Sequence, residues 1–308
     1  MTHSDPERDG GREAAEPAGD SSRWGVDSEY GLLRDVLLGP PEHFRWLPTS
    51  AISKATLESG AVFDPQAARA QHSELVSAYE VADVRVHVLD ADPHLPYQVF
   101  ARDSSTMIPE GAVVLAPAQQ WRRGEYAPVI RFYQRNEIPI RGMISAGAIE
   151  GGDVTIVEPG CMLIGNGEER TQVQAAEQLA GWIRESGWEV RIEPIPGQFV
   201  HIDVLVSILA PKLAAVCVEA ASGGLVAWLR AKGFEILEVS IEDAFRLGVN
   251  AMSLGGDRVI STRHSQALNE AMRAHGLTVL DPDLSAFTAG GGGAHCLAQA
   301  LRREPGSG

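Results

Sequence analysis

The chain has 308 residues, 44% of them hydrophobic, and carries 26 Lys and Arg against 41 Asp and Glu, for a formal net charge of −15. This acidic balance repels phosphate backbones, so nucleic acid is not expected as a partner. No apolar run reaches the roughly 18 residues of a membrane span, and the N-terminus lacks a signal-peptide pattern. Three cysteines without a CxxC pair exclude a disulfide framework. We therefore expect a globular cytoplasmic protein without a membrane partner.

Both ends of the chain are predicted to be tails. Residues 1–22 contain almost no large apolar side chains and many acidic ones. Such a segment cannot bury enough apolar surface to offset the entropy of ordering it, so we predict a disordered acidic tail. Residues 304–308 are predicted as a short, frayed C-terminal tail. The segment between them, 23–303, is expected to form a single α/β domain.

The domain opens with two loose copies of one pattern, in which two strands are followed by a helix and a further strand. The first copy is incomplete, with strands at 36–38 and 84–89 and a helix at 67–79. The second copy has its two strands, helix and last strand, in that order, at 106–108, 113–116, 126–134 and ending at Ile140. This repetition is the first sign of an architecture built from similar units.

Three clearer copies follow, each of about fifty residues. They begin after Asp153, Asp203 and Asn250 with a β-rich run, and a helix with apolar residues at i, i+3, i+4 and i+7 comes next. The helices are expected at 171–187, 223–233 and 265–276, each ending near a glycine suited to a left-handed C-cap. Five ββαβ units around an axis would form a propeller with five blades, and an open α/β sheet is the alternative.

Acidic residues recur at equivalent points of successive units. Asp103, Asp153 and Asp203 are 50 residues apart (153 − 103 and 203 − 153). Equivalent points of units around an axis converge on that axis, so these carboxylates and His201 are expected to line a central pocket. Converging acids repel one another unless a cation lies among them. The pattern therefore predicts a cationic substrate or a metal.

The metal alternative is the weaker one. Its ligands would be His201, Asp203, His295 and Cys296. Their mixture of types and their spacing match no known metal motif, so no metal is expected. His201 and Asp203 would share one face of a strand because side chains alternate along a strand, and this supports a joint role.

A run of four glycines, residues 290–293, precedes Cys296. Glycine allows positive φ and a close approach of the backbone to a ligand, which makes Cys296 a candidate nucleophile. The alternative is a buried free cysteine after a flexible turn. Cys161 and Cys217 lie in apolar β runs and are predicted to pack in the core. The basic run 121–123 is predicted to be solvated surface.

Five motifs lie in order along the chain: FARDSS (100–105), IEGGD (149–153), GNGEERT (165–171), HID (201–203) and GGGGAHC (290–296). Together they resemble the guanidino-group-modifying superfamily, which includes arginine deiminase, dimethylarginine dimethylaminohydrolase, agmatine deiminase and the amidinotransferases. The resemblance implies a five-bladed ββαβ propeller, the pentein fold, in agreement with the repeats.

The resemblance also implies a role for each matching residue. Cys296 would attack the guanidinium carbon, and His201 would protonate the departing amine and then activate water. Glu150 would hold His201 and a guanidinium nitrogen. The implied substrate-binding residues are Asp103 and Asp203 for the guanidinium, Asp153 in support of the Glu150 loop and Arg170 for the α-carboxylate.

The expected activity is cofactor-free hydrolysis of a small cationic guanidino, or a ureido, amino acid. It would convert dimethylarginine or arginine to citrulline through a covalent thiouronium adduct on Cys296. The alternatives are an amidinotransferase that passes the amidino group to an amine, an arginine or citrulline hydrolase that forms ornithine, and, with least support, a non-catalytic binding protein. A homo-oligomer is possible, but the sequence does not give the oligomeric state. Residues 41–62 would be an ordinary surface loop or, less favoured, a lid.

Overall fold

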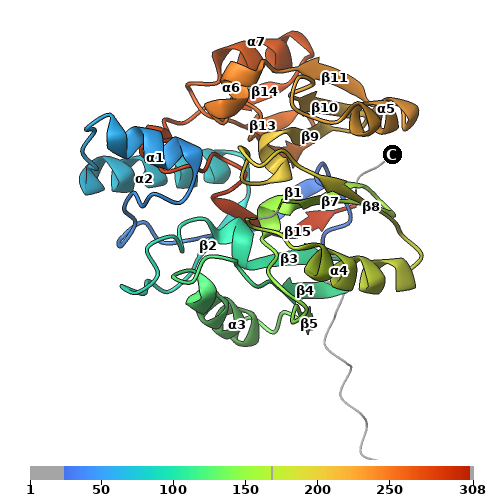
Figure 1. Cartoon of the computed structure of the whole chain (residues 1–308), viewed down its shortest axis with the longest axis horizontal. Helices are drawn as coiled ribbons and strands as arrows, with labels where there is room; N and C mark the ends of the chain where they lie inside the picture. Colours follow the sequence, from blue (N-terminus) through green and yellow to red (C-terminus); the bar gives the residue numbers. More distant parts are fainter. Residues whose placement is uncertain (1–23, 168, 306–308) are drawn as a thin grey trace, which may run out of the picture.

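The structure, a computed structural model, describes residues 24–167 and 169–305 (Figure 1). The acidic tail predicted for 1–22 and the end of the predicted C-terminal tail, 306–308, lie outside the described residues. Within them, no helix has the length and apolar character needed to cross a membrane. Glu304, predicted as part of the tail, instead ends a strand, β15 (Ala298–Glu304), and its side chain pairs with Arg34.

The described strands form five three-stranded sheets, and four of these repeat one plan. Two antiparallel strands are followed by a helix, and the third strand then pairs in parallel with the middle one. The four sets are β3 (Ser105–Ile108), β4 (Gly111–Val114), α3 (Tyr126–Arg135) and β5 (Ile140–Met143); β6 (Val154–Glu158), β7 (Cys161–Asn166), α4 (Val173–Glu185) and β8 (Glu189–Pro194); β9 (Val206–Ala210), β10 (Leu213–Val216), α5 (Gly223–Ala231) and β11 (Glu235–Glu238); β12 (Met252–Gly255), β13 (Arg258–Ile260), α7 (Gln266–Ala274) and β14 (Thr278–Leu280).

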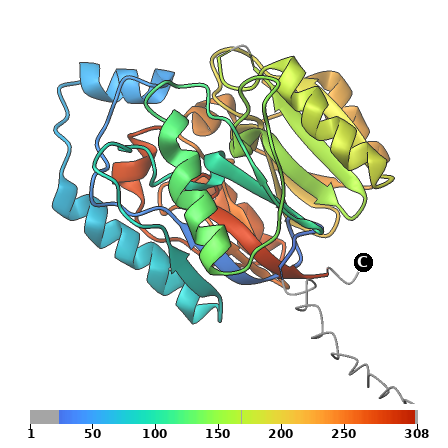
Figure 2. The same cartoon turned by 90° about the horizontal axis from the view of Figure 1, so that it is seen from below.

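The fifth sheet joins the two ends of the described chain. β1 (Leu32–Leu38) pairs in parallel with β2 (Arg85–Val88) after α2 (Pro65–Val81), as in the other sheets. Its antiparallel partner is β15, with Val36 opposite Ala300. Figure 2 shows the two strands, blue and red, side by side. The first sheet is therefore completed only by the last strand, which the sequence analysis does not predict.

The predicted α/β repeat is confirmed in most of its elements, with local differences. The strand expected to end at Ile140 instead begins there. Three further helices are α1 (Ala51–Glu58), α6 (Ile241–Phe245) and α8 (Ser285–Thr288). The surface loop preferred for 41–62 is wrong over its second half, because Ser50 and Ser53 form a reciprocal capping box that starts α1.

Both views show helices such as α2, α3 and α4 on the outside and the strands within. Cys161 and Cys217 are buried among the apolar residues of the strands, as predicted. A short 3-10 turn leads into the first strand of three sheets: Ala101–Ser104 before β3, Gly151–Asp153 before β6 and Ile202–Val204 before β9. These three turns bring the repeated acidic residues to equivalent places in the interior.

Candidate active site

Hydrogen bonds connect each of these turns to the next one. Asp103 Oδ1 accepts from the backbone N–H of Gly152 at 3.1 Å. Asp153 Oδ1 accepts in the same way from Ile202 at 2.8 Å. The acidic residue of one unit therefore holds the turn of the following unit, and the spacing of 50 residues reflects this link as well as convergence on a centre.

Asn250 continues the connection to the cysteine loop. Its Nδ2 donates to the backbone oxygen of Asp203 at 3.2 Å. Its Oδ1 accepts from the backbone N–H groups of His295 and Cys296 at 3.1 and 3.2 Å. The backbone N–H of Arg102 then donates to the carbonyl of Cys296 at 3.3 Å, which closes a ring of contacts. Cys296 is thus held in place by two neighbouring units.

His201 lies in an acidic and buried environment. Its Nε2 is 2.8 Å from Glu150 Oε2, whereas its Nδ1 is 3.8 Å from Asp103 Oδ1 and has no hydrogen-bond partner in the part of the chain that the structure describes. Burial alone would lower the pKa of His201, but the carboxylates of Asp103, Asp153 and Glu150 outweigh it and raise this pKa to about 10. The imidazole is therefore protonated at neutral pH and can serve as an acid.

The predicted shared strand face of His201 and Asp203 is wrong. His201 precedes the 3-10 turn Ile202–Val204 and is not part of a strand. The turn separates the two side chains, so that His201 contacts Glu150 and Asp203 contacts His295. The two residues consequently belong to opposite sides of the site.

Arg170 joins the same group as His201. Its Nη1 donates to Glu150 Oε2 at 3.1 Å and its Nη2 to the backbone oxygen of Thr49 at 2.6 Å. Its Nε is buried without a hydrogen-bond partner among the described residues. A buried donor without a partner is costly, so this atom is available to a ligand's acceptor.

Arg122 is a site residue that the sequence analysis assigns wrongly to solvated surface. Its side chain is only 2% exposed. Nη1 donates to Asp103 Oδ2 at 2.6 Å, and Nε and Nη2 donate to the two oxygens of Glu125, each at 2.9 Å. The sequence signal is weak, because Glu125 is close in the chain but Asp103 is 19 residues away. Its flanking residues Trp121 and Arg123 are exposed, as predicted for that run.

The thiol lies on the other side of the site. Cys296 Sγ is 3.5 Å from Asp203 Oδ2, and the same oxygen is 2.9 Å from His295 Nδ1. Burial, followed by the charges of Asp203 and Asp103, raises the pKa of the Cys296 thiol well above its ordinary value. The thiol is therefore protonated in the free protein and needs a nearby positive charge to ionise.

His295 partly offsets the charge of Asp203. Its Nε2 is also 3.5 Å from Glu29 Oε2, which comes from the segment before β1. Burial and Arg102 lower the pKa of His295, but the contacts with Asp203 and Glu29 outweigh them and raise it. Glu29 in turn accepts from Arg102 Nη2 at 2.7 Å. The sequence does not predict the contacts of Glu29 with His295 and Arg102, because they join residues far apart in the chain.

One small cavity connects the two sides. The residues that line it are Thr49, Ser50, Tyr97, Phe100, Asp103, Arg122, Arg170, Val200, His201, Gly290, Gly291, Gly292 and Cys296. Four predicted site residues, Cys296, His201, Asp103 and Arg170, therefore face one space. The other three, Glu150, Asp153 and Asp203, are buried behind this lining.

The glycine loop approaches its neighbours closely, but mostly without positive φ. Within 290–293 only Gly291 has a positive φ, of 102°. A Cβ on Gly292 would lie 2.3 Å from the ring of Phe100, so the loop fits against that ring only with glycine there. The run thus serves tight packing beside the cavity more than an unusual backbone conformation.

The spacing of Asp103, Glu150 and His201 would also fit a metal, with their ligand atoms within 4.8 Å of one another. The two arginines already contact these carboxylates, Arg122 at Asp103 and Arg170 at Glu150. A divalent cation would have to compete with two guanidinium groups. The cluster is therefore best described as an ion-pair network. Asp203, His295 and Cys296, named above as alternative ligands, are not part of it.

The chain matches known proteins over most of its length. The family model described as N,N dimethylarginine dimethylhydrolase, eukaryotic, matches residues 47–303. The uncharacterized protein YkgA of Bacillus subtilis is 30% identical over 278 residues, which cover 90% of this chain and 94% of YkgA.

Solved structures show the same fold. A mutant of the dimethylarginine dimethylaminohydrolase of Pseudomonas aeruginosa, complexed with citrulline, is similar with a TM-score of 0.74 and 21% identity, over 87% of this chain and 99% of that one. The N-terminal domain of ArgZ, an arginine dihydrolase in Cyanobacteria, is similar with a TM-score of 0.76 and 20% identity, over 88% and 98%. These findings confirm the predicted α/β fold and the resemblance. The chain belongs to the dimethylarginine dimethylaminohydrolase family, within the pentein superfamily of guanidino-modifying enzymes.

Proposed function

We propose that the chain hydrolyses a guanidino amino acid through a covalent adduct on Cys296. In this proposal residues 23–303 act as one catalytic domain, and the five sheets are the five blades of a propeller. The observation that carries the proposal is the single cavity lined at once by Cys296, His201, Asp103 and Arg170. A nucleophile, an acid, a carboxylate and a guanidinium around one space suit a substrate that carries both a guanidinium and a carboxylate.

Two unsatisfied buried atoms support this placement of the substrate. Asp203 Oδ1 has no hydrogen-bond partner within residues 24–167 and 169–305, and it lies on the same carboxylate that contacts the thiol. A guanidinium N–H group bound there would put the guanidinium carbon next to sulfur. Arg170 Nε, which also has no partner among those residues, would donate to the α-carboxylate at the other end. Each contact would give a buried polar atom a hydrogen-bond partner and so remove the free-energy cost of leaving it without one.

The reaction follows from the protonation states of the two sides. The bound guanidinium brings positive charge next to Cys296 and lowers the pKa of the thiol, which then gives its proton to solvent water. The thiolate attacks the guanidinium carbon. The bond from this carbon to the departing nitrogen breaks, and His201 gives that nitrogen its proton from Nδ1. Glu150, bound to Nε2, holds the ring.

Water completes the cycle. His201, now neutral, accepts a proton from water as the oxygen attacks the carbon of the adduct. The carbon–sulfur bond breaks, and the proton of the newly added hydroxyl group passes to sulfur. This regenerates the Cys296 thiol and releases a ureido product. Arginine would give citrulline and ammonia, and dimethylarginine would give citrulline and dimethylamine. The name of the Pseudomonas aeruginosa relative supports the second substrate.

The test is product analysis by mass spectrometry after incubation with arginine, dimethylarginine, agmatine or citrulline separately. Citrulline from either of the first two substrates, absent with Cys296→Ser, is the expected result. Ornithine as the product would favour the dihydrolase alternative. Turnover that requires an added amine such as glycine would replace the hydrolase by an amidinotransferase. Unchanged turnover with Cys296→Ser would overturn the covalent mechanism.

A further inference from the structure

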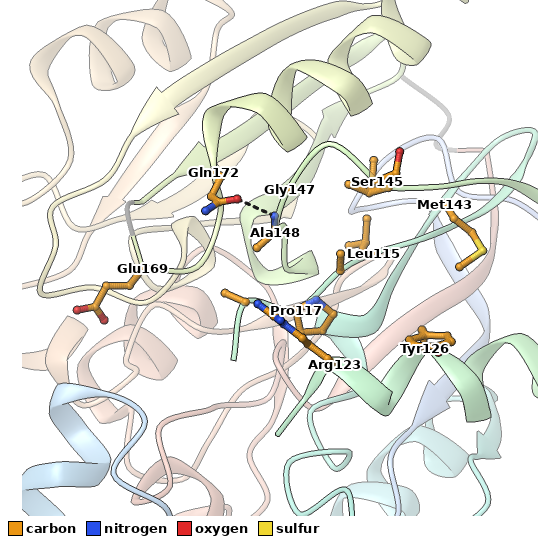
Figure 3. Close-up of a pocket in the computed structure, with 13 residues that line it drawn as sticks. Leu115, Pro117, Arg123, Tyr126, Met143, Ser145, Gly147, Ala148, Glu169 and Gln172 are labelled. Carbon is orange, nitrogen blue, oxygen red and sulfur yellow. Dashed lines mark hydrogen bonds between the residues drawn. The ribbon is translucent and has the colours of Figure 1, made fainter. Parts of the chain in front are cut away.

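A second and larger cavity, of about 600 Å³, lies beside the candidate active site (Figure 3). Its walls come from the segment after β4, from α3 and β5, and from the chain before α4. Most of the lining is apolar or small, and Leu115, Pro117 and Met143 are examples. A cavity of this size accommodates a small organic molecule. No residue of the proposed reaction lines it.

Among the described residues that line this cavity, Arg123 has the only positively charged side chain. Figure 3 shows it together with Pro117, which also lines the cavity. No hydrogen bond or ion pair to another described residue engages its guanidinium, although the chain as a whole is strongly acidic. Arg122, one residue earlier, in contrast has all its nitrogens bound. Arg123 is therefore free to bind an anion, and a carboxylate matches the guanidinium fork best.

The apolar part of the ligand is indicated by two exposed side chains. Tyr126 is 44% exposed and Met143 is 48% exposed, and both face this cavity. Large apolar side chains gathered at a cavity mark a binding surface more often than isolated ones do. An aromatic ring or a branched chain would contact both. Glu169, at another part of the wall, disfavours a second negative charge on the ligand.

Hydrogen bonds also connect the walls of this cavity to the candidate active site. The backbone N–H of Ala118 donates to Glu150 Oε1 at 3.0 Å. Ala116, two residues earlier, accepts from the backbone N–H of Ile149 at 2.9 Å. A ligand that packs on 116–118 would favour the arrangement in which Ala118 holds Glu150, and Glu150 holds His201.

We propose that this cavity is a second binding site for a small monocarboxylate with an aromatic or branched apolar body. The carboxylate binds Arg123, and the apolar body contacts Tyr126 and Met143. Occupancy increases the rate of the reaction at Cys296 by fixing Glu150. This last step rests on the proposed function, whereas binding does not.

The test uses isothermal titration calorimetry with 3-phenylpropionate as the probe. Full-length Cys296→Ser protein is expected to bind it at one site, and Arg123→Gln to bind it at least about tenfold more weakly. Arg69→Gln, which removes an exposed charge on α2 away from this cavity, is the matched control and should bind normally. The neutral 3-phenylpropionamide should bind as weakly to wild type as the acid does to Arg123→Gln. Circular dichroism checks that each variant folds.

The outcomes separate the two proposals. Equal binding by wild type and Arg123→Gln, no binding at all, or displacement of the probe by citrulline would each overturn the second site. Both parts are supported if binding depends on Arg123 and if adding the probe raises kcat in wild type but not in Arg123→Gln. If binding depends on Arg123 but the probe leaves kcat unchanged, the proposed coupling through Glu150 is wrong. Arg123-dependent binding by a protein that turns over no guanidino compound leaves the site in place and overturns the proposed function.

Discussion

The two sides of the candidate active site differ in how their charges are balanced. On the acid side, Glu150 contacts both the imidazole of His201 and the guanidinium of Arg170, at 2.8 and 3.1 Å. On the thiol side, Asp203 has one hydrogen-bonded imidazole, that of His295, and is 3.5 Å from Cys296 Sγ. On the side of His201, the imidazole is therefore already protonated before substrate binds. On the side of Cys296, the substrate must supply the positive charge that ionises sulfur.

The largest expected effect is at the thiol side. Cys296→Ser should lower kcat by about a thousandfold or more, because a hydroxyl is a far weaker nucleophile than a thiolate. Binding of a guanidino ligand should persist, because the other lining residues remain. Rates come from citrulline assays and affinity from calorimetry. Cys217→Ser, which changes a buried cysteine outside the cavity, is the control and should keep its activity.

A smaller loss is expected from the acid side. Glu150→Gln removes a carboxylate that contributes to the raised pKa of His201, so the pKa of His201 should fall and the alkaline limb of the pH–rate profile should move to lower pH. We expect kcat at pH 8 to drop about a hundredfold. Glu193→Gln, a buried glutamate on β8, is the control. A drop in kcat without movement of the limb would argue against the pairing of Glu150 with His201.

Asn250 tests the thiol side without touching the thiol itself. Asn250→Asp keeps an acceptor for the N–H groups of His295 and Cys296 but loses the donor to Asp203 and adds a negative charge. The thiol pKa should rise further, and alkylation of Cys296 by iodoacetamide at pH 8 should slow at least about tenfold. Asn269→Asp offers a matched control, since Asn269 is also buried and donates to a backbone oxygen, that of Thr262. Equal alkylation rates would contradict the role given to Asn250.

The protonated imidazole also predicts a pH dependence of stability. The pKa of His201 is about 10 in the folded chain, above its ordinary value of 6.5, so the folded state binds this proton more tightly than the unfolded state does. Its stabilising contribution is complete below pH 6.5 and is lost as pH rises through 10. The free energy of unfolding should decline over this range, and less steeply in His201→Gln. Urea titrations at several pH values measure it, and parallel declines would contradict the prediction.

The smallest effect is expected from metal removal. Arg122 and Arg170 already contact the carboxylates whose spacing would fit a metal. Dialysis against EDTA should therefore leave the rate within about twofold. A loss restored by a divalent cation would show that the cluster holds a metal in solution.

The sequence predicts the repeated elements well because each helix has its own apolar period and its own glycine at the end. It also predicts that Asp103 and His201 meet, because equivalent points of repeated units converge, and the family resemblance adds Cys296 to them. What it misses depends on pairs of distant residues. The burial of Arg122 requires Asp103, and strand β15 is formed by pairing with β1. The polar residues of β15 interrupt the apolar pattern by which a strand is recognised in a sequence.

The pairing of β1 with β15 has a consequence for how the protein is made. Cys296 lies two residues before β15, and its backbone is bound by Arg102 and Asn250. During synthesis the first sheet lacks its outer strand until residues 298–304 have left the ribosome. Cys296 can take its place in the candidate active site only at that stage, so a chain cut short before residue 298 is not expected to assemble the cavity around it. Placement of the proposed nucleophile is thus tied to the synthesis of β15.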